Sequence, residues 1–354
     1  MHRFRTCIIA LLFTFSILAP GSRAQAQGGK LEEINVSYQP ALYWALPFFV
    51  ATEKNWWQEV GLKANFSTFP AGAPQVATLA NKAWDVGGTG SVPALLGASR
   101  FKLLTIGITN DESAANVLMV RGDKVAEYQK NPASIKGKQI LLTTNSTGDY
   151  AVTSALKKLG LTKADVQMVN MGQAQIISAI SSNNGELAGV WAPNTYTLQE
   201  KVGAKVLYTG KDVGAEVPGA LVAREDFAQQ HPQTVAKFLA VYLRAQKWCR
   251  DNRAEAVQMM QKFYKQGGVE LADKYLNEEF DTRPTFGLAE QLKLMDRGAG
   301  GTSTFDGWLS KIGDFMKSVG TVAEAPQPKT FVTDEYLKLV AKDPKLKAFA
   351  DNQP

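Results

Sequence analysis

The chain has 354 residues, of which 45% are hydrophobic and 20% charged, and it contains only two histidines and two cysteines. This composition is that of an ordinary globular protein, and the length allows two domains with buried cores. The scarcity of histidine and cysteine excludes most metal clusters, histidine-based catalytic triads and disulfide frameworks. The formal charge of +6 suggests a basic protein, but the first segment of the chain revises that figure.

The first 26 residues have the pattern of a secretory signal peptide. Arg3 and Arg5 precede an apolar run, and Ala24 and Ala26 place small residues before a cut after Ala26. The apolar run of roughly 14 residues is short against the ~20 that span a bilayer. We therefore expect residues 1–26 to be cleaved and the product to be periplasmic.

Cleavage changes the charge and the thiol count. The mature chain keeps 328 residues, with 36 basic and 33 acidic side chains, so its net charge is about +3. It retains only His231 and Cys249, which allows no internal disulfide. The basic residues are scattered, which gives no support to nucleic-acid binding. We expect His231 to cap a surface helix and Cys249 to be a buried, unreactive thiol.

Short β-like runs alternate with helical patterns, which is typical of βα units in parallel sheets. Asn55 and Gly61 are predicted left-handed helix stops. The first unit is predicted to contain the strand 34–38, a helix opened by Pro47, the strand 63–69, the helix 73–82, the strand 83–88, the helix 91–97 capped by Ser91, and the strand 101–109.

The predicted strand 116–120 leads out of this unit, and the alternation of strands and helices then begins again in a second unit. The second unit is predicted to contain the strands 139–144, 166–171, 187–191 and 205–208 and the helices 147–159, 174–182 and 195–202. The strand 217–222 would return the chain to the first unit, so the segments 112–121 and 212–223 would form a hinge. The remainder is predicted to be helical, with a helix opened by Pro232, another capped by Asn252, and helices at 288–295, 308–319 and 334–342.

Glycine and hydroxyl side chains recur at the predicted carboxyl ends of the strands, with amphipathic aromatic residues beside them. Open α/β sheets bind ligands at this edge, and the first turn of a helix offers free N–H groups to an anion. The candidate ligand-binding residues are Gln39, Tyr43, Gly72, Thr89, Gly90, Ser91, Asn110, Asn145, Ser146, Thr147, Trp191 and Asn194. Any one of them is equally consistent with helix capping or core packing, but their recurrence in both units favours a small anion held without lysine or arginine.

The sequence gives little support to catalysis. It has no Gly-x-Ser-x-Gly elbow, and Ser146-Thr147-Gly148 lacks the Gly-Lys-Ser/Thr of a Walker loop. Asp111 and Glu112 are the only acidic pair near a predicted cleft turn, but adjacent side chains seldom converge on one reacting atom. We therefore expect no enzyme, no cofactor and no metal.

Several motifs together point to one protein family. They are Ser37-Tyr38-Gln39, Pro47 followed by Ala51-Thr-Glu-Lys54 and Gly61-Leu62, Ala83-Trp84-Asp85-Val86-Gly87 with Gly90-Ser91, Ile135-Lys-Gly-Lys138, Ser146-Thr147, Leu159-Gly160-Leu161 and Val190-Trp191-Ala-Pro193. With them, nearly all of the mature chain resembles the exported solute-binding proteins of ABC importers, in the sulfonate/taurine/nitrate-type family that is related to thiamine-precursor-binding proteins. The resemblance carries binding roles onto Gln39, Gly72, Gly90, Ser91, Ser146, Thr147 and Trp191.

The resemblance implies an α/β fold of the two-lobed periplasmic-binding-protein type (type II). Two Rossmann-like lobes would be joined by a two-strand hinge, with extra C-terminal helices. Lobe 1 would comprise residues 30–115 plus 220–354, and lobe 2 residues 116–219. The implied function is that of a monomeric substrate-binding component of an ABC importer, which captures a small organic or inorganic anion and delivers it to a membrane permease and its ATPase.

Two departures from the family concern the ligand. Relatives commonly have an acidic residue where this chain has Ala192 and Asn194, and the first crossing, residues 113–116, lacks an expected carboxylate. Both departures argue against an amine-bearing ligand such as taurine and favour a simple anion or a neutral heterocycle. Binding of a pyrimidine or thiamine precursor, and presentation of a ligand to a membrane sensor, remain alternatives. A pyrimidine-forming enzyme would need a histidine and a cysteine-rich iron site that this chain lacks.

Overall fold

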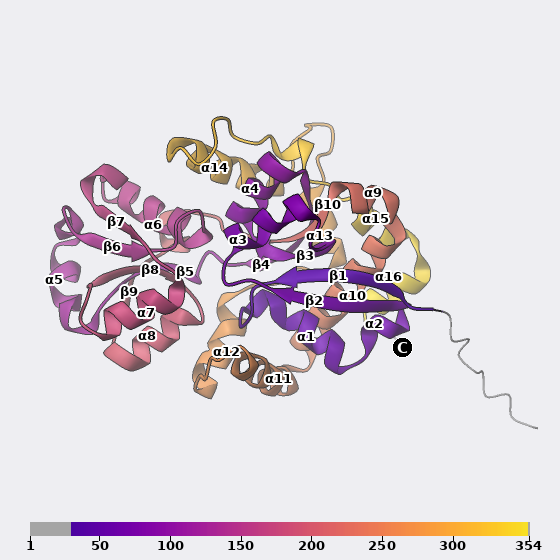
Figure 1. Cartoon of the computed structure of the whole chain (residues 1–354), viewed down its shortest axis with the longest axis horizontal. Helices are drawn as coiled ribbons and strands as arrows, with labels where there is room; N and C mark the ends of the chain where they lie inside the picture. Colours follow the sequence, from indigo (N-terminus) through magenta and orange to yellow (C-terminus); the bar gives the residue numbers. More distant parts are fainter. Residues whose placement is uncertain (1–29, 353–354) are drawn as a thin grey trace, which may run out of the picture. The chain divides into compact units, whose positions relative to one another are not determined.

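The computed structural model describes residues 30–352, and the predicted signal peptide lies outside them. These residues contain two five-stranded sheets (Figure 1). The sheet of lobe 1 has the order β2-β1-β3-β10-β4, with β1 (Glu32–Tyr38), β2 (Leu62–Thr68), β3 (Val86–Gly90), β4 (Leu103–Asp111) and β10 (Pro218–Arg224). The sheet of lobe 2 has the order β7-β6-β8-β5-β9, with β5 (Asn116–Val120), β6 (Gln139–Leu142), β7 (Gln167–Asn170), β8 (Leu187–Trp191) and β9 (Lys205–Thr209).

The two sheets follow the same plan, and each contains one antiparallel strand. β10 pairs antiparallel with β3 and β4, and β5 pairs antiparallel with β8 and β9. The other pairs are parallel. The sequence predicted parallel sheets of βα units, and the exceptions to the parallel pairing are the two strands that follow a crossing. A chain arriving from the other lobe enters the sheet at the edge where the parallel strands end, so it must run in the opposite direction.

Lobe 2 buries both faces of its sheet. Along β5, Leu118 and Val120 belong to one apolar cluster, which α6 completes, while Val117 and Met119 belong to another, which α7 and α8 complete. Because side chains alternate along a strand, an unbroken apolar run fits a strand covered on both faces. The helices of this lobe are α5 (Val125–Lys130), α6 (Thr147–Lys158), α7 (Gln173–Ser181) and α8 (Asn194–Val202).

Lobe 1 carries the C-terminal helices, and α10 is its central helix. The ring of Phe48 in α1 packs against Phe238 and Tyr242 of α10, at centroid distances of 5.8 and 5.2 Å. The Tyr242 hydroxyl also donates a hydrogen bond to the carbonyl of Trp44. The helices are α1 (Leu46–Glu53), α2 (Trp56–Glu59), α3 (Gly72–Ala77), α4 (Ser91–Phe101), α9 (Glu225–Gln230), α10 (Pro232–Asp251), α11 (Arg253–Gln266), α12 (Asp273–Thr282), α13 (Leu288–Met295), α14 (Thr304–Ser318), α15 (Glu335–Lys342) and α16 (Pro344–Ala350).

Cys249 lies on the buried face of α10, as predicted. Its side chain is buried, and this burial raises the pKa of the thiol to about 12. The thiolate is the reactive form of cysteine, so the thiol is inert near neutral pH.

Two predicted helix caps are wrong. Ser91 is the first residue of α4 rather than its cap, because the extended residue before the helix is Gly90, and the Ser91 hydroxyl makes no capping bond. Asn252 does precede α11, but its side-chain amide donates to the carbonyl of Trp248 in α10 instead of capping α11. His231 occupies the N-cap position of α10 as predicted, although its side chain makes no capping hydrogen bond there.

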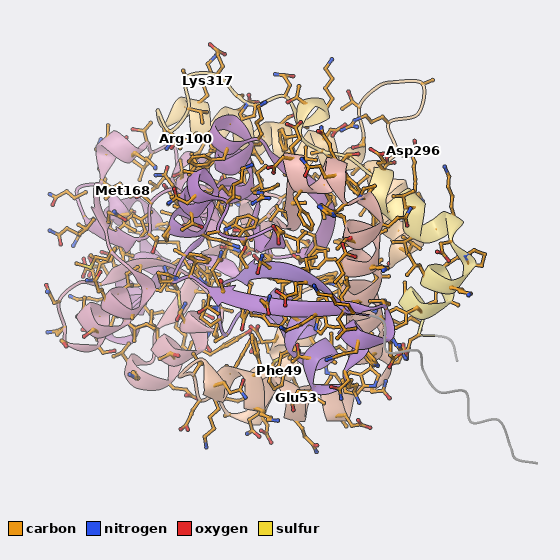
Figure 2. All side chains as sticks on the ribbon, turned by 45° about the vertical axis from the view of Figure 1, so that its right-hand side comes forward. Phe49, Glu53, Arg100, Met168, Asp296 and Lys317 are labelled. Atoms are coloured by element: carbon orange, nitrogen blue, oxygen red, sulfur yellow. The ribbon has the colours of Figure 1, made fainter. Side chains whose placement is uncertain are left out.

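α14 begins four residues before its predicted start. Ser303 and Asp306 form a capping box there, which satisfies N–H groups of the first turn. The helix packs against α4. Near the end of α4, Arg100 donates from Nη2 to the carbonyl of Thr321, at 3.2 Å. Figure 2 labels Arg100 and, at the end of α14, Lys317.

Two connections join the sheets, residues 112–115 between β4 and β5 and residues 210–217 between β9 and β10. They run side by side and are hydrogen-bonded to one another. The N–H of Glu112 donates to the carbonyl of Val217 at 2.8 Å, and the N–H of Val217 donates to the hydroxyl of Ser113 at 2.9 Å. Within residues 30–352, every helix is too short or too polar to cross a bilayer.

Candidate ligand-binding cleft

A small cavity of about 30 Å³ lies where the two lobes meet. From lobe 1, Gln39, Gly72 and Gly90 come at or just after the carboxyl ends of β1, β2 and β3. From lobe 2, Ser146 and Trp191 come at or just after the ends of β6 and β8. This is the edge at which open α/β sheets bind ligands. The cavity is lined by Gln39, Leu42, Trp44, Gly72, Gly90, Pro93, Glu112, Ser146, Thr147 and Trp191.

Two helices begin at this cavity, α4 from lobe 1 and α6 from lobe 2. A Cβ atom on Gly90 would lie only 2.9 Å from Cγ2 of Thr147, so the two helix starts are in close contact across the lobes. The first residues of these helices, Ser91 and Thr147, carry hydroxyl groups with no hydrogen-bond partner among residues 30–352. No lysine or arginine is among the described residues that line the cavity.

A buried amide network supports the lobe 1 side of the cavity. Nε2 of Gln39 donates to Oε1 of Gln75 and, at 3.2 Å, to the hydroxyl of Thr89. Gln75 in turn donates to the hydroxyl of Ser37 at 2.8 Å and to the carbonyl of Gly88 at 2.9 Å. Because every member is bonded to another element, the network fixes the orientation of Gln39 at the cavity wall.

On the lobe 2 side, the cavity wall is formed by the start of α6, which several side-chain contacts hold in place. The hydroxyl of Ser146 donates to the carbonyl of Thr143 at 2.6 Å and accepts from the N–H of Asp149 at 3.2 Å, which makes it the N-cap of the helix. The buried carboxylate of Asp149 forms an ion pair with Lys163 at 2.7 Å. These contacts hold the helix start, and with it the free hydroxyl of Thr147, against the cavity.

The structure brings six of the predicted residues together around the cavity, namely Gln39, Gly72, Gly90, Ser146, Thr147 and Trp191. Thr89 and Ser91 are buried beside Gly90, where Thr89 accepts the hydrogen bond from Gln39. That these residues contact a ligand remains a prediction.

Four other predicted residues lie off this cavity. Asn110 accepts a hydrogen bond from the hydroxyl of Thr109, and Asn145 accepts one from the hydroxyl of Thr321, at 3.0 and 2.8 Å. Asn194 lines a larger groove of about 750 Å³ between the lobes, which shares the walls of Gln39, Leu42 and Trp191 with the cavity. Tyr43 packs edge-on against Phe280, with a centroid distance of 5.3 Å, and lines a separate pocket.

Four residues that line the cavity were not among the candidate ligand-binding residues: Leu42, Trp44, Pro93 and Glu112. Trp44 had a usable signal, because it is an aromatic residue in the turn after the first strand, but core packing explained it equally well. The expectation that the first crossing lacks a carboxylate is wrong. The carboxylate sought in the first crossing is present, one residue before the segment 113–116, and it lines the cavity.

Glu112 belongs to a buried cluster of three charged side chains. Nη1 of Arg283 lies 3.2 Å from a carboxylate oxygen of Glu279 and 3.6 Å from one of Glu112. Nη2 of Arg283 donates to the carbonyl of Ala192 in lobe 2, at 3.1 Å. The guanidinium is 1% exposed and the Glu279 carboxylate is fully buried. Two carboxyl groups therefore share one guanidinium at the hinge.

This environment shifts the titration of Glu112. Burial raises its pKa to about 7, and Arg283 only partly opposes the shift because Glu279 and Asp111 add negative charge nearby. Among residues 30–352, no group of three or more histidine, cysteine, aspartate or glutamate side chains could hold a metal ion.

Two aromatic pairs join the lobes on either side of the hinge. Tyr196 of α8 stacks on Tyr275 of α12 with a centroid distance of 4.7 Å, and Tyr150 of α6 contacts Phe315 of α14 at 5.1 Å. An aromatic pair contributes about 0.5–1.5 kcal/mol beyond its buried area. Both pairs therefore favour the arrangement in which the lobes are in contact.

We expect the Tyr275→Ala variant to increase the population of separated lobes. Small-angle scattering should show a larger radius of gyration, because the stack with Tyr196 is lost. Trp308→Ala is the control, since its ring contacts Phe305 within lobe 1, at 6.2 Å. An unchanged radius for Tyr275→Ala, or an equal increase for Trp308→Ala, would contradict the role of the stack.

The chain is similar in sequence to a protein family and to known binding proteins. Residues 45–256 match the model of the family described as NMT1/THI5 like. A Brucella abortus protein that is predicted to be a binding protein is 28% identical over 298 residues, which is 83% of this chain and 88% of that protein. The taurine-binding periplasmic protein of Escherichia coli is 31% identical over 218 residues, 60% of this chain and 65% of that protein.

The structure is also similar to that of the periplasmic aliphatic sulphonate binding protein SsuA from Escherichia coli. The TM-score is 0.70 at 18% identity, with 87% of this chain and 99% of that chain covered. This similarity confirms the predicted two-lobed fold. The family match spans more than half of the 354 residues. The chain therefore belongs to the NMT1/THI5-like family.

Proposed function

We propose that this protein is the substrate-binding component of an ABC importer, which captures a small anion of the sulfonate or nitrate type in the periplasm and delivers it to a membrane permease. The observation that carries the proposal is the pair of helix starts, one from each lobe, with free hydroxyl groups at Ser91 and Thr147. Helix N-termini offer unpaired N–H groups and a partial positive charge. An anion between them would contact both lobes at once. The names of the relatives support the same ligand class.

Capture would operate by closure of the two lobes, residues 30–115 with 220–354 and residues 116–219. A cavity of about 30 Å³ has room for a water molecule or two but not for an organic sulfonate. The lobes must therefore part to admit the ligand, and the larger groove beside Trp191 is the route. The ligand then favours the closed state by its higher affinity for that state. The monomer with its ligand would dock on the permease, whose ATPase drives transport.

The direct test is calorimetric binding of a ligand panel. The panel contains 2-aminoethanesulfonate, propane-1-sulfonate, nitrate, sulfate and a neutral pyrimidine. We expect at least one anion to bind and to compact the protein in small-angle scattering. Binding of the pyrimidine alone would overturn the proposal. Mass spectrometry of small molecules that co-purify from the periplasm gives an independent identification.

Thr147→Val is expected to weaken anion binding by about tenfold, because a hydrogen bond to a charged group contributes roughly 1.5 kcal/mol or more. The substitution removes only the free hydroxyl at the start of α6. Thr153→Val is the matched control on the same helix, since its hydroxyl bonds to Asp149, away from the cavity. Calorimetry should show a loss for Thr147→Val alone. Equal affinities of the two variants would exclude Thr147 as an anion donor.

A further inference from the structure

Arg283 joins the two lobes directly at the hinge. It follows α12 in lobe 1, and its Nη2 donates to the carbonyl of Ala192 in lobe 2, at 3.1 Å. The N–H of Ala192 donates to the carbonyl of Ala115 in the first hinge connection, at 3.0 Å. Ala192 comes directly after Trp191, which lines the ligand cavity. Arg283 therefore reaches, from the other lobe, the backbone that carries one wall of the cavity.

Lobe 1 holds this guanidinium in place without a contact from lobe 2. Nη1 lies 3.2 Å from a carboxylate oxygen of Glu279, and the same oxygen accepts a hydrogen bond from the hydroxyl of Tyr264 in α11. Glu112 lies 3.6 Å away, and the guanidinium carbon lies over the ring of Tyr43, 5.5 Å from its centroid. A guanidinium is planar and rigid, so it loses little rotational freedom when it forms a further hydrogen bond. Nη2 is thus already directed at the position that the lobe 2 carbonyl takes in the closed form.

The hydrogen bond between Arg283 and Ala192 is of a kind that favours closure. The side chain of Arg283 is 1% exposed and Ala192 is 2% exposed, so the bond is shielded from water. A charged donor makes a stronger hydrogen bond than a neutral one, and shielding strengthens it further. The donor and the acceptor belong to different lobes, so the bond is lost when the lobes part. An interaction that is made only in the closed form shifts the equilibrium toward that form.

We infer that Arg283 is a positioning residue that latches the lobes together and so retains the ligand without touching it. The inference deepens the proposed function, and the part of it that concerns ligand release rests on that function. Between the guanidinium and the ligand lies Glu112, which lines the cavity. The latch forms after the ligand has entered, so it slows reopening and leaves entry unchanged. Its effect belongs to the dissociation rate, where most differences in affinity between related complexes arise.

The variant Arg283→Lys removes the latch and keeps the positive charge. Lysine has a single nitrogen, which pairs with Glu279 as a point charge and cannot also hold the lobe 2 carbonyl. We expect propane-1-sulfonate to dissociate roughly tenfold faster from this variant at an unchanged association rate, because a charge-assisted hydrogen bond is lost. Stopped-flow tryptophan fluorescence measures both rates, since Trp44 and Trp191 line the cavity. Small-angle scattering of the ligand-free variant should show a larger radius of gyration.

Arg297→Lys is the matched control, because Arg297 makes the same two kinds of contact within lobe 1. Its Nε and Nη2 bind the carboxylate of Asp306 at 2.8 and 2.9 Å, and Nη2 also donates to the carbonyl of Val332 at 3.0 Å. This substitution should lower the midpoint of urea unfolding but leave the dissociation rate and the radius of gyration unchanged. An arginine with a purely structural role thus differs from a latch in both measurements.

The outcomes separate the latch from the function. If both lysine variants speed dissociation equally, the effect comes from the stability of lobe 1 and the inference is wrong. If Arg283→Lys changes neither the dissociation rate nor the radius, the inference is also wrong, and the proposed function stands. If no anion of the panel binds, the proposed function is wrong and the radius decides: a larger radius for Arg283→Lys alone supports the latch, and an unchanged radius overturns it.

Two provisions keep the experiment decisive. If nitrate or sulfate binds in place of propane-1-sulfonate, the same two rates are measured with that anion. If Arg283→Lys does not fold, the double variant Arg283→Met/Glu279→Gln replaces it, because it lacks the donor of the latch and also the carboxylate that the guanidinium neutralises. The same increase in dissociation rate is expected, and an unchanged rate would again overturn the inference.

Discussion

Gly90→Val is expected to reduce ligand affinity by at least about 100-fold, equivalent to roughly 2.7 kcal/mol. Gly90 has an extended backbone that valine can adopt, so the cost is one of space between the lobes. A Cβ atom there would lie 2.9 Å from Cγ2 of Thr147, and the branched side chain adds two more methyl groups toward lobe 2. The variant should fold normally but fail to close. Calorimetry and small-angle scattering with and without the ligand measure the two effects.

Two further variants test this explanation. Gly300→Val is the control, because a Cβ atom at Gly300 has no neighbour within 4 Å and the residue lies far from the cavity in sequence. The milder Gly90→Ala should be rescued by Thr147→Ser, which removes the Cγ2 atom in question. If Gly90→Val compacts on ligand addition like the wild-type protein, contact between the helix starts is not needed for closure.

Arg283→Met is expected to lower the free energy of unfolding by about 3–5 kcal/mol at pH 8. The guanidinium is 1% exposed and is the shared partner of two buried carboxyl groups, Glu279 and Glu112. Without it, both would have to be buried as anions or take up protons. The loss should shrink as the pH falls, because burial already raises the pKa of Glu112 and removal of Arg283 would raise it further, so that protonation of this carboxyl group would stabilise the folded form. Urea unfolding at pH 5 and pH 8 measures the difference.

The matched comparison is with an exposed ion pair. Lys317 and Glu324 are 2.7 Å apart with side chains 50% and 84% exposed, and Lys317→Met should change stability by less than about 1 kcal/mol. The double variant Arg283→Met/Glu279→Gln should recover much of the loss, because it removes one of the stranded charges. If Arg283→Met proves no more destabilising than Lys317→Met, the buried cluster does not contribute as the contacts indicate.

Much of the fold could be predicted because its strands are short, apolar and sharply bounded. The limits of the strands 116–120 and 187–191 and of the helix 288–295 were predicted to the residue. α12 was missed because its segment contains more charged than apolar residues, and it forms a helix only where Tyr275, Leu276 and Glu279 are buried. Its stability comes from tertiary contacts, which no local pattern records.

The site was predictable where it depends on chain order and not where it depends on side-chain direction. Glycine and hydroxyl residues after strands marked the helix starts, because those positions share one sheet edge. Asp111 and Glu112 are adjacent, and only the course of the chain after β4 decides which of them reaches the cavity. Arg283 comes from a distant helical segment, so no spacing in the sequence connects it with Glu112.

The burial of Cys249 makes the protein convenient for labelling. It is the only cysteine of residues 30–352, and its raised pKa keeps the thiol from reacting with maleimides near neutral pH. A pair of cysteines introduced on the groove walls, at Lys201 of lobe 2 and Glu270 of lobe 1, would thus be the reactive thiols. Fluorophores attached to them would report the distance between the walls by energy transfer, so that opening and closing could be followed in single molecules.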